Sequence, residues 1–106
     1  MEKRDYTRIT CPMELTMHMI AGKWKLVILW HLAVDEVKRY GEIKKSIPNI
    51  THKVLSSQLK ELEKDDLIIR KEYLQVPPKV EYCLSKKGKT LIPILNDIFK
   101  WGQKYL

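Results

Sequence analysis

Residues 50–65 contain the side chains whose types and spacing best suit chemistry, a set of lysines and hydroxyl groups at helical spacing. On a helical wheel of about 3.6 residues per turn, Lys53, Ser57, Lys60 and Lys64 share one face. Ammonium groups pair with phosphate oxygens, and lysine, serine and threonine can hydrogen-bond to base edges in the major groove. The stripe therefore predicts a helix that reads DNA, and a solvated surface helix is the alternative that the same pattern allows.

The opposite face of this predicted helix is apolar. Leu55, Leu59 and Leu62 recur at helical spacing, which places all three on one side. Thr51 can cap the helix by accepting a hydrogen bond from an unpaired backbone N–H, and Ile50 and Leu55 occupy the two positions of a hydrophobic staple. The stretch thus has a start signal, a core face and an outward polar face.

Length and composition limit the class of protein. The chain has 106 residues, which fit a single domain over residues 1–106, and 20 basic against 13 acidic residues give a net charge of +7. This balance favours a polyanionic partner, nucleic acid before an anionic membrane surface. No apolar run could span a bilayer, the N-terminus does not resemble a signal peptide, and two cysteines favour a reducing compartment. We therefore expect a cytoplasmic protein without a membrane partner.

Three further helices are expected before the lysine-rich stretch. In the first, Met13, Met17 and Ile20 share an apolar face; the second is apolar around most of its circumference, as in the central helix of a small core. The third is separated from the lysine-rich helix by a short turn, which gives a helix-turn-helix arrangement. The helices are predicted over residues 12–21, 23–33 and 40–46, with a polar link over 34–38 and a turn at Pro48 and Asn49.

A β-hairpin is expected directly after the lysine-rich helix. Residues 67–76 are rich in β-branched and aromatic side chains, and residues 80–84 alternate apolar with polar, with Cys83 facing outward. Between them, Pro77 and Pro78 force a turn. The order of elements predicts a winged helix-turn-helix, an α+β fold that is mostly helical. Positive charge along the wing would come from Arg70, Lys71 and Lys79.

The last predicted helix covers residues 86–106, with Ser85 as its N-cap and a kink at Pro93. Its apolar side chains form two strips, and a domain of this size can cover only one of them. A second copy of the chain is the simplest partner for the other strip, so we expect a homodimer. The residues expected at the dimer interface are Leu91, Leu95, Ile98, Phe99 and Trp101.

Taken together, these features resemble a known family. The motifs that carry the resemblance are C-P-M-E-L-T, A-G-K-W-K-L-V-I-L, R-Y-G-E-I, I-T-H-K-V-L-S-S-Q-L-K-E-L-E-K-D-D-L-I, V-P-P-K-V-E-Y-C-L-S-K-K-G, and L-I-P-I-L followed by W-G. Over residues 11–102 the chain resembles the HxlR-type, MarR-like winged helix-turn-helix regulators of bacteria. The resemblance implies a homodimeric transcriptional regulator on a pseudo-palindromic operator in double-stranded DNA, with N- and C-terminal helices joining the two domains. It also implies that Cys11 senses oxidants or electrophiles, as in some members.

The residues expected to contact DNA lie mainly in the lysine-rich helix. Such a helix reads bases through its N-terminal turns. The candidates for base contacts are Thr51, His52, Lys53, Ser56 and Ser57. The candidates for phosphate contacts are Lys60 and Lys64 in the same helix, with Arg39, Lys44, Lys45 and Lys79 outside it.

Cys11 has two interpretations. At the start of a helix, unpaired N–H groups and the helix dipole favour a thiolate, and Lys3, Arg4 and Arg8 are close in sequence. An exposed thiolate could act as an oxidant-sensing switch. The alternative is a small apolar residue buried between helices, as most free cysteines are. The sequence alone leaves both interpretations open, and Cys83 is expected to have no special role.

Other functions have weaker support. The spacing of His18, His31, His52 and the two cysteines does not suit a metal site, and we expect neither a metal nor another cofactor. No phosphate loop or pairing of nucleophile and base indicates an enzyme. A winged helix that binds protein and a regulator with a small-molecule effector, bound near Trp24, Trp30 and Trp101, are the alternatives. A small dimer that blocks a promoter is the simplest mechanism, so repression is expected over activation.

Overall fold

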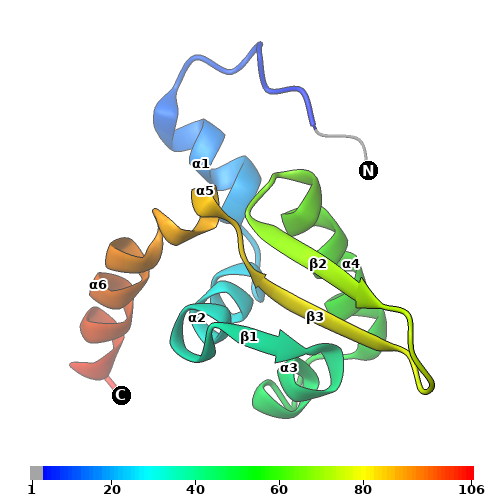
Figure 1. The fold of residues 1–106 in the computed structure, drawn as a ribbon. Helices are drawn as coiled ribbons and strands as arrows, with labels where there is room; N and C mark the ends of the chain where they lie inside the picture. Colours follow the sequence, from blue (N-terminus) through cyan, green and yellow to red (C-terminus); the bar gives the residue numbers. More distant parts are fainter. Residues whose placement is uncertain (1–3) are drawn as a thin grey trace.

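The computed structural model describes residues 4–106, and Lys3, which the sequence placed near Cys11, lies outside this range. Helices α2, α3 and α4 pack against a small sheet whose hairpin projects from the fold, α1 precedes them in the chain, and two further helices follow the sheet (Figure 1). The elements in chain order are α1 (Pro12–Ile20), α2 (Lys25–Asp35), β1 (Val37–Arg39), α3 (Tyr40–Ser46), α4 (His52–Lys64), β2 (Ile68–Tyr73), β3 (Lys79–Leu84), α5 (Lys86–Lys89) and α6 (Ile92–Gln103). The winged helix-turn-helix prediction is confirmed.

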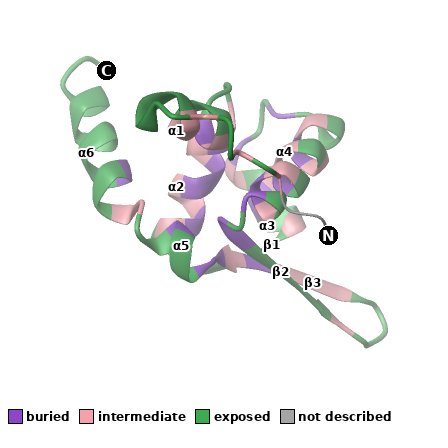
Figure 2. Ribbon diagram, turned by 90° about the horizontal axis from the view of Figure 1, so that it is seen from above, coloured by how far each residue is buried: buried purple, intermediate pink, exposed green. Residues whose placement is uncertain are grey.

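Helix α4 has the two faces that its sequence predicts. Leu55, Leu59 and Leu62 are fully buried, and they join a core built around Ile28 and Leu29 of α2. Figure 2 shows this buried strip of α2 lying among the other elements. The Oγ1 atom of the N-cap residue, Thr51, accepts a hydrogen bond from the backbone N–H of Val54 at 3.1 Å. The cap and the leucine stripe therefore fix where α4 begins and which face turns outward.

The sheet contains a strand, β1, that overlaps the polar link predicted over residues 34–38. Strand β1 pairs antiparallel with β3, and β3 lies between β1 and β2. Lys38 of β1 is buried, with its Nζ atom 2.9 Å from Oδ2 of Asp35 and 2.6 Å from Oγ of Ser46. These partners satisfy the ammonium group, so a lysine can occupy an inward strand position that patterning assigns to apolar residues.

The predicted helix over residues 86–106 is divided into two. Ser85 caps α5 as expected, because its Oγ accepts a hydrogen bond from the N–H of Gly88 at 2.9 Å. The chain then breaks at Thr90 and Leu91, and Pro93 lies in the first turn of α6 rather than inside a kinked helix. Proline has no N–H to donate, so it is tolerated in the first turn of a helix, which is where Pro93 lies in α6.

Helix α6 extends away from the rest of the fold and is largely exposed along its length (Figure 2). Leu95 is buried in the core of its own chain and Leu91 is partly buried against that core, while their place in a dimer interface stays a prediction. The three remaining residues of the predicted interface, Ile98, Phe99 and Trp101, are exposed.

Of the three residues on the predicted apolar face of α1, Ile20 is buried, whereas Met13 and Met17 are exposed. Within residues 4–106, no helix is both long and apolar enough to cross a bilayer.

Candidate nucleic-acid interface

The N-terminal turns of α4 are held against α3 by one phenol. The Oη atom of Tyr40 lies 3.0 Å from Nδ1 of His52, 3.2 Å from the His52 carbonyl oxygen and 3.2 Å from Oγ of Ser56. The rings of Tyr40 and His52 also stack, with centroids 5.8 Å apart and planes inclined by 15°. Tyr40 begins α3, so this contact ties the two helices of the helix-turn-helix together.

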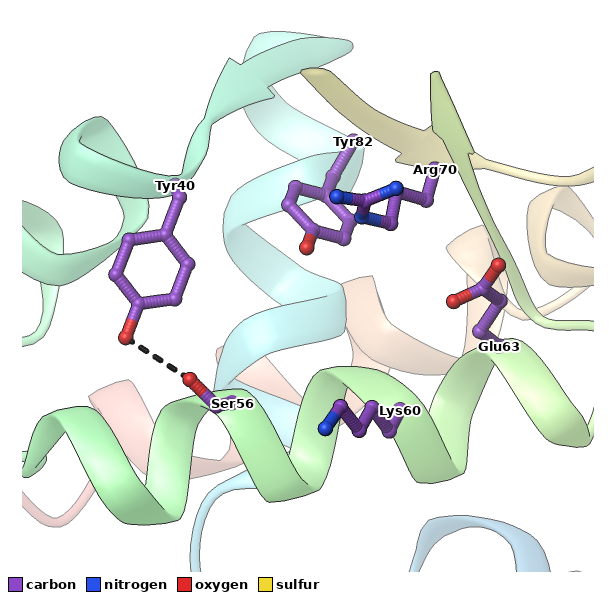
Figure 3. A pocket seen from close by; sticks show the side chains of 6 residues that line it. All are labelled: Tyr40, Ser56, Lys60, Glu63, Arg70 and Tyr82. Atoms are coloured by element: carbon purple, nitrogen blue, oxygen red, sulfur yellow. Dashed lines mark hydrogen bonds between the residues drawn. The ribbon is translucent and has the colours of Figure 1, made fainter. Parts of the chain in front are cut away.

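A cleft of about 400 Å³ lies between α4 and the sheet. Figure 3 shows its walls, with Tyr40 and Ser56 at one end and Arg70 and Tyr82 across from α4. Lys60 and Glu63 of α4 line it as well. The phenol of Tyr82 contributes most to raising the pKa of the Arg70 guanidinium above its ordinary value. The cleft thus combines two cations with one carboxylate beside the base of the wing.

The predicted base contacts separate into two groups. Thr51, His52, Lys53 and Ser57 are exposed, as a surface that enters the major groove requires. Ser56 is half-buried and points into the cleft, where its hydroxyl meets Tyr40 (Figure 3). We therefore assign Ser56 to the contact between α3 and α4 rather than to the reading surface.

The predicted phosphate contacts are spread over several elements. Lys60 and Lys64 are exposed on α4, and Lys64 lies at its far end, next to a small cleft that Arg4 and Tyr6 also line. Arg39 is exposed just before α3, where its N–H donates to Oε1 of Glu42 at 2.8 Å. The remaining candidates within α3 are Lys44, which is half-buried, and Lys45, which is exposed.

The wing carries positive charge that neighbouring side chains restrain. Lys79 lies over the ring of Tyr73 at 4.3 Å from its centroid, and its ammonium is 3.7 Å from a carboxylate oxygen of Glu81. Lys71 also lies over the ring of Tyr73, with its ammonium 5.1 Å from the ring centroid. These contacts hold the two lysines beside the hairpin at a modest gain in energy, because both are partly solvated.

The far end of α4 is anchored to the N-terminal segment. The phenol of Tyr6 donates a hydrogen bond of 2.6 Å to Oδ1 of Asp65, whose side chain is fully buried. Burial, followed by this hydrogen bond, raises the pKa of Tyr6 to about 12. Arg4 and Lys25 approach Glu61, one turn earlier, at 3.2 and 3.4 Å. Both ends of α4 are therefore fixed, and its outward face is left free.

The two cysteines differ in exposure. Cys11 is exposed at the N-cap of α1 and is not buried between helices of its own chain. Its carbonyl oxygen accepts the hydrogen bond from Leu15 that starts the helix, at 3.0 Å. Cys83 is half-buried on β3, and both thiols are free. Among residues 4–106 no group of three or more histidine, cysteine or acidic side chains is arranged to hold a metal.

Tyr40 was missed as a site residue by sequence reasoning. Its partners are 12 and 16 residues away, and a tyrosine at the start of a helix carries no local signal of such contacts. Arg70 was expected only as a charge along the wing, whereas the structure places it at the wall of the cleft facing α4. Finding Tyr40 requires the packing of α3 against α4, and finding Arg70 requires the packing of β2 against α4.

Comparison with known proteins agrees with this geometry. The profile of the family described as HxlR-like helix-turn-helix matches residues 19–106. YtcD of Bacillus subtilis, named as an HTH-type transcriptional regulator, is 48% identical over 106 residues, which cover 100% of this chain and 81% of YtcD. An HTH-type transcriptional regulator of Halalkalibacterium halodurans is 56% identical over 93 residues, 88% of this chain and 82% of that protein.

Solved structures of a redox regulator and of a second transcriptional regulator share the fold. The redox regulator HypR in its oxidized form superposes with a TM-score of 0.84 at 45% identity, covering 89% of this chain and 96% of HypR. The diamide-treated form of YodB from B. subtilis gives a TM-score of 0.71 at 32% identity, covering 92% of this chain and 95% of YodB. The chain is thus a transcriptional regulator with a helix-turn-helix DNA-binding fold.

Proposed function

We propose, from the premise that this chain belongs to the HxlR-like helix-turn-helix family, that it binds a pseudo-palindromic operator as a homodimer and represses transcription there. The observation that carries the proposal is the division of α4 into two faces. Leu55, Leu59 and Leu62 are buried, while His52, Lys53, Ser57 and Lys60 are exposed on a helix whose two ends are held in place. A fixed, exposed and basic helix of this kind suits the major groove.

The proposed dimer is supported by the apolar surface of α6. Leu95 and the stacking of Phe99 on Trp30, with ring centroids 4.4 Å apart, attach one side of α6 to its own chain. The outer side leaves Ile98 and Trp101 exposed to solvent by 45% and 66%. Covering such side chains is favourable by about 25 cal/mol per Å². A second copy that presents the same helix around a two-fold axis would cover both surfaces equally.

Two-fold symmetry also fixes the form of the DNA site. Two α4 helices related by such an axis read the same half-site in opposite directions, about one helical turn or a multiple of it apart. The operator would then be pseudo-palindromic. A dimer seated across a promoter excludes polymerase sterically, which favours repression over activation.

Oxidant sensing is proposed for Cys11 on two grounds. The thiol is exposed at the N-terminus of α1, and the structural relatives include a redox regulator solved in oxidized and reduced forms. The peptide between Cys11 and Tyr6 joins this thiol to the anchor at the end of α4. Oxidation at Cys11 could therefore alter how α4 is held.

The test is DNA binding by the purified chain. Duplexes selected by the wild type from a random pool should contain an inverted repeat, and binding should change after diamide treatment. Cys11→Ser should abolish that change, whereas Cys83→Ser, the matched control, should preserve it. A pool that yields no motif would overturn the proposed operator, and an equal diamide response in Cys11→Ser would overturn the sensing role.

A further inference from the structure

The three contacts of the Tyr40 hydroxyl constrain where protons lie. A phenol carries one proton, and its oxygen can also accept hydrogen bonds. The carbonyl oxygen of His52 can only accept, so the contact at 3.2 Å requires Tyr40 to donate its proton there. The contacts at 3.0 Å to Nδ1 of His52 and at 3.2 Å to Oγ of Ser56 must then be donated toward the phenol oxygen. All three contacts are hydrogen bonds together only in this arrangement.

This arrangement determines the tautomer of His52. A neutral imidazole carries one proton, so a protonated Nδ1 leaves Nε2 as a hydrogen-bond acceptor. Stacking against Tyr40, with planes inclined by 15°, fixes the orientation of the ring as well. His52 is exposed in the first turn of α4, and Nε2 has no hydrogen-bond partner within residues 4–106.

The major groove contains the matching donors. Cytosine presents its N4 amino group there and adenine its N6 amino group, whereas guanine and thymine present acceptors at the equivalent edge. We propose that Tyr40 is a positioning residue that holds His52 in the Nδ1–H tautomer, so that Nε2 accepts a hydrogen bond from the exocyclic amino group of adenine or cytosine. The proposal rests on the proposed function, because it assigns a specificity to the helix that is expected to read DNA.

A purely structural role for Tyr40 would make different predictions. If the residue only joined α3 to α4, its aromatic ring and the packing of that ring would suffice. Tyr40→Phe keeps the ring that stacks on His52 and removes only the hydroxyl. The variant therefore separates the proton arrangement from the packing. Tyr105→Phe is the matched control, because Tyr105 is exposed near the C-terminus and 53 residues away from His52 in sequence.

The first measurement needs no DNA. Nitrogen-15 NMR of the histidine rings at about pH 8.5, well above the reference pKa of histidine, reports which ring nitrogen carries the proton. The Nδ1–H form of His52 should dominate in wild type and in Tyr105→Phe, and the Nε2–H form should gain population in Tyr40→Phe. A dominant Nε2–H form in wild type, or an unchanged Nδ1–H form in Tyr40→Phe, would overturn the role of Tyr40.

The second measurement tests the base partner. In duplexes selected from a random pool by wild type, one position in each half-site should require adenine or cytosine on the strand that His52 reads. Tyr40→Phe should relax that position and bind the selected duplex about fivefold more weakly, with unchanged affinity for scrambled DNA. In a His52→Ala background, Tyr40→Phe should cost no further affinity. An unchanged preference would overturn the base assignment. If wild type selects no motif, the proposed function fails, but the NMR measurement still decides whether Tyr40 sets the tautomer of His52.

Discussion

The phenol of Tyr6 donates a 2.6 Å hydrogen bond to Oδ1 of Asp65 and so attaches the N-terminal segment to the end of α4. The two residues are 59 positions apart in sequence, and Asp65 is the C-cap residue of α4. The carboxylate is buried, so it needs this donor to compensate for lost hydration. The pair thereby connects the segment that leads to Cys11 with the helix expected to read DNA.

Removing the Tyr6 hydroxyl should destabilise the fold without changing its shape. Tyr6→Phe is expected to lower the free energy of unfolding by about 1–2 kcal/mol, because a hydrogen bond to a charged group is lost while the ring remains. Urea denaturation followed by circular dichroism would measure the difference. Thr7→Val is the matched control, since Thr7 is exposed and adjacent. Equal stability of Tyr6→Phe and wild type would show that the contact contributes nothing.

Alkaline pH should weaken the same contact. The folded protein holds the Tyr6 proton up to a pKa of about 12, whereas the reference value is 10.0. A raised folded-state pKa means that the contribution to stability is complete below about pH 10 and is lost as the pH rises through 12. The difference in unfolding free energy between wild type and Tyr6→Phe should therefore shrink from pH 9 to pH 11.5. A difference that stays constant over this range would contradict the raised pKa.

Lys60 should contribute one phosphate contact. Lys60→Ala is expected to weaken binding to every duplex and to reduce the slope of log K against log salt by about one unit, because one fewer counterion is released. Lys100→Ala, which removes an exposed lysine on α6, should leave the slope unchanged. Fluorescence anisotropy at salt concentrations from about 50 to about 200 mM would measure the slope. An unaltered slope in Lys60→Ala would remove Lys60 from the phosphate contacts.

Gly88 should tolerate no side chain. A Cβ atom at this position would overlap the carbonyl oxygen of Leu67, which belongs to the backbone leading into β2. Gly88→Ala is therefore expected to lower the free energy of unfolding by about 2–3 kcal/mol. Gly41→Ala, where a Cβ atom would meet nothing within 4 Å, should cost nothing or stabilise α3 slightly. Thermal denaturation would compare the stabilities of the two variants. A Gly88→Ala variant at least as stable as Gly41→Ala would contradict the prediction.

The outer face of α6 should control the oligomeric state. Ile98→Asp combined with Trp101→Asp places two charges on the exposed apolar surface and should raise the dimer dissociation constant about 30-fold or more. Val34→Asp, at another exposed apolar position on α2, should leave the dimer intact. Sedimentation velocity would separate monomer from dimer. A double variant that dimerises like wild type would place the interface elsewhere.

The sequence predicted the parts of the molecule whose signals are local. The cap of α4 involves Thr51 and Val54, and the leucine stripe repeats within the same helix, so both could be found by spacing alone. Strand β1 could not, because Lys38 is accommodated by Asp35 and Ser46 in ways that patterning does not describe. The contact of Tyr40 in α3 with His52 and Ser56 in α4 could not be predicted either, because it joins residues that are distant in sequence.

The candidate site shows the same division. The exposed cations of α4 were predicted from the stripe, whereas the direction of Ser56 was not, because it depends on where α3 places Tyr40. The burial of Leu95 within its own chain could not be predicted either, because periodicity gives the face of a helix but not what covers that face. In both cases the missing information was the position of a neighbouring element.

The most direct test of the central claim is the discrimination between DNA sequences by the exposed face of α4. The ratio of affinities for a selected duplex and a scrambled duplex should be measured for wild type and for the triple variant His52→Ala, Lys53→Ala, Ser57→Ala, at one salt concentration. We predict that wild type binds the selected duplex about 1,000-fold or more tightly than the scrambled one. The triple variant should fold normally and bind both duplexes almost equally. A triple variant that retains the wild-type ratio would show that α4 is not the reading helix.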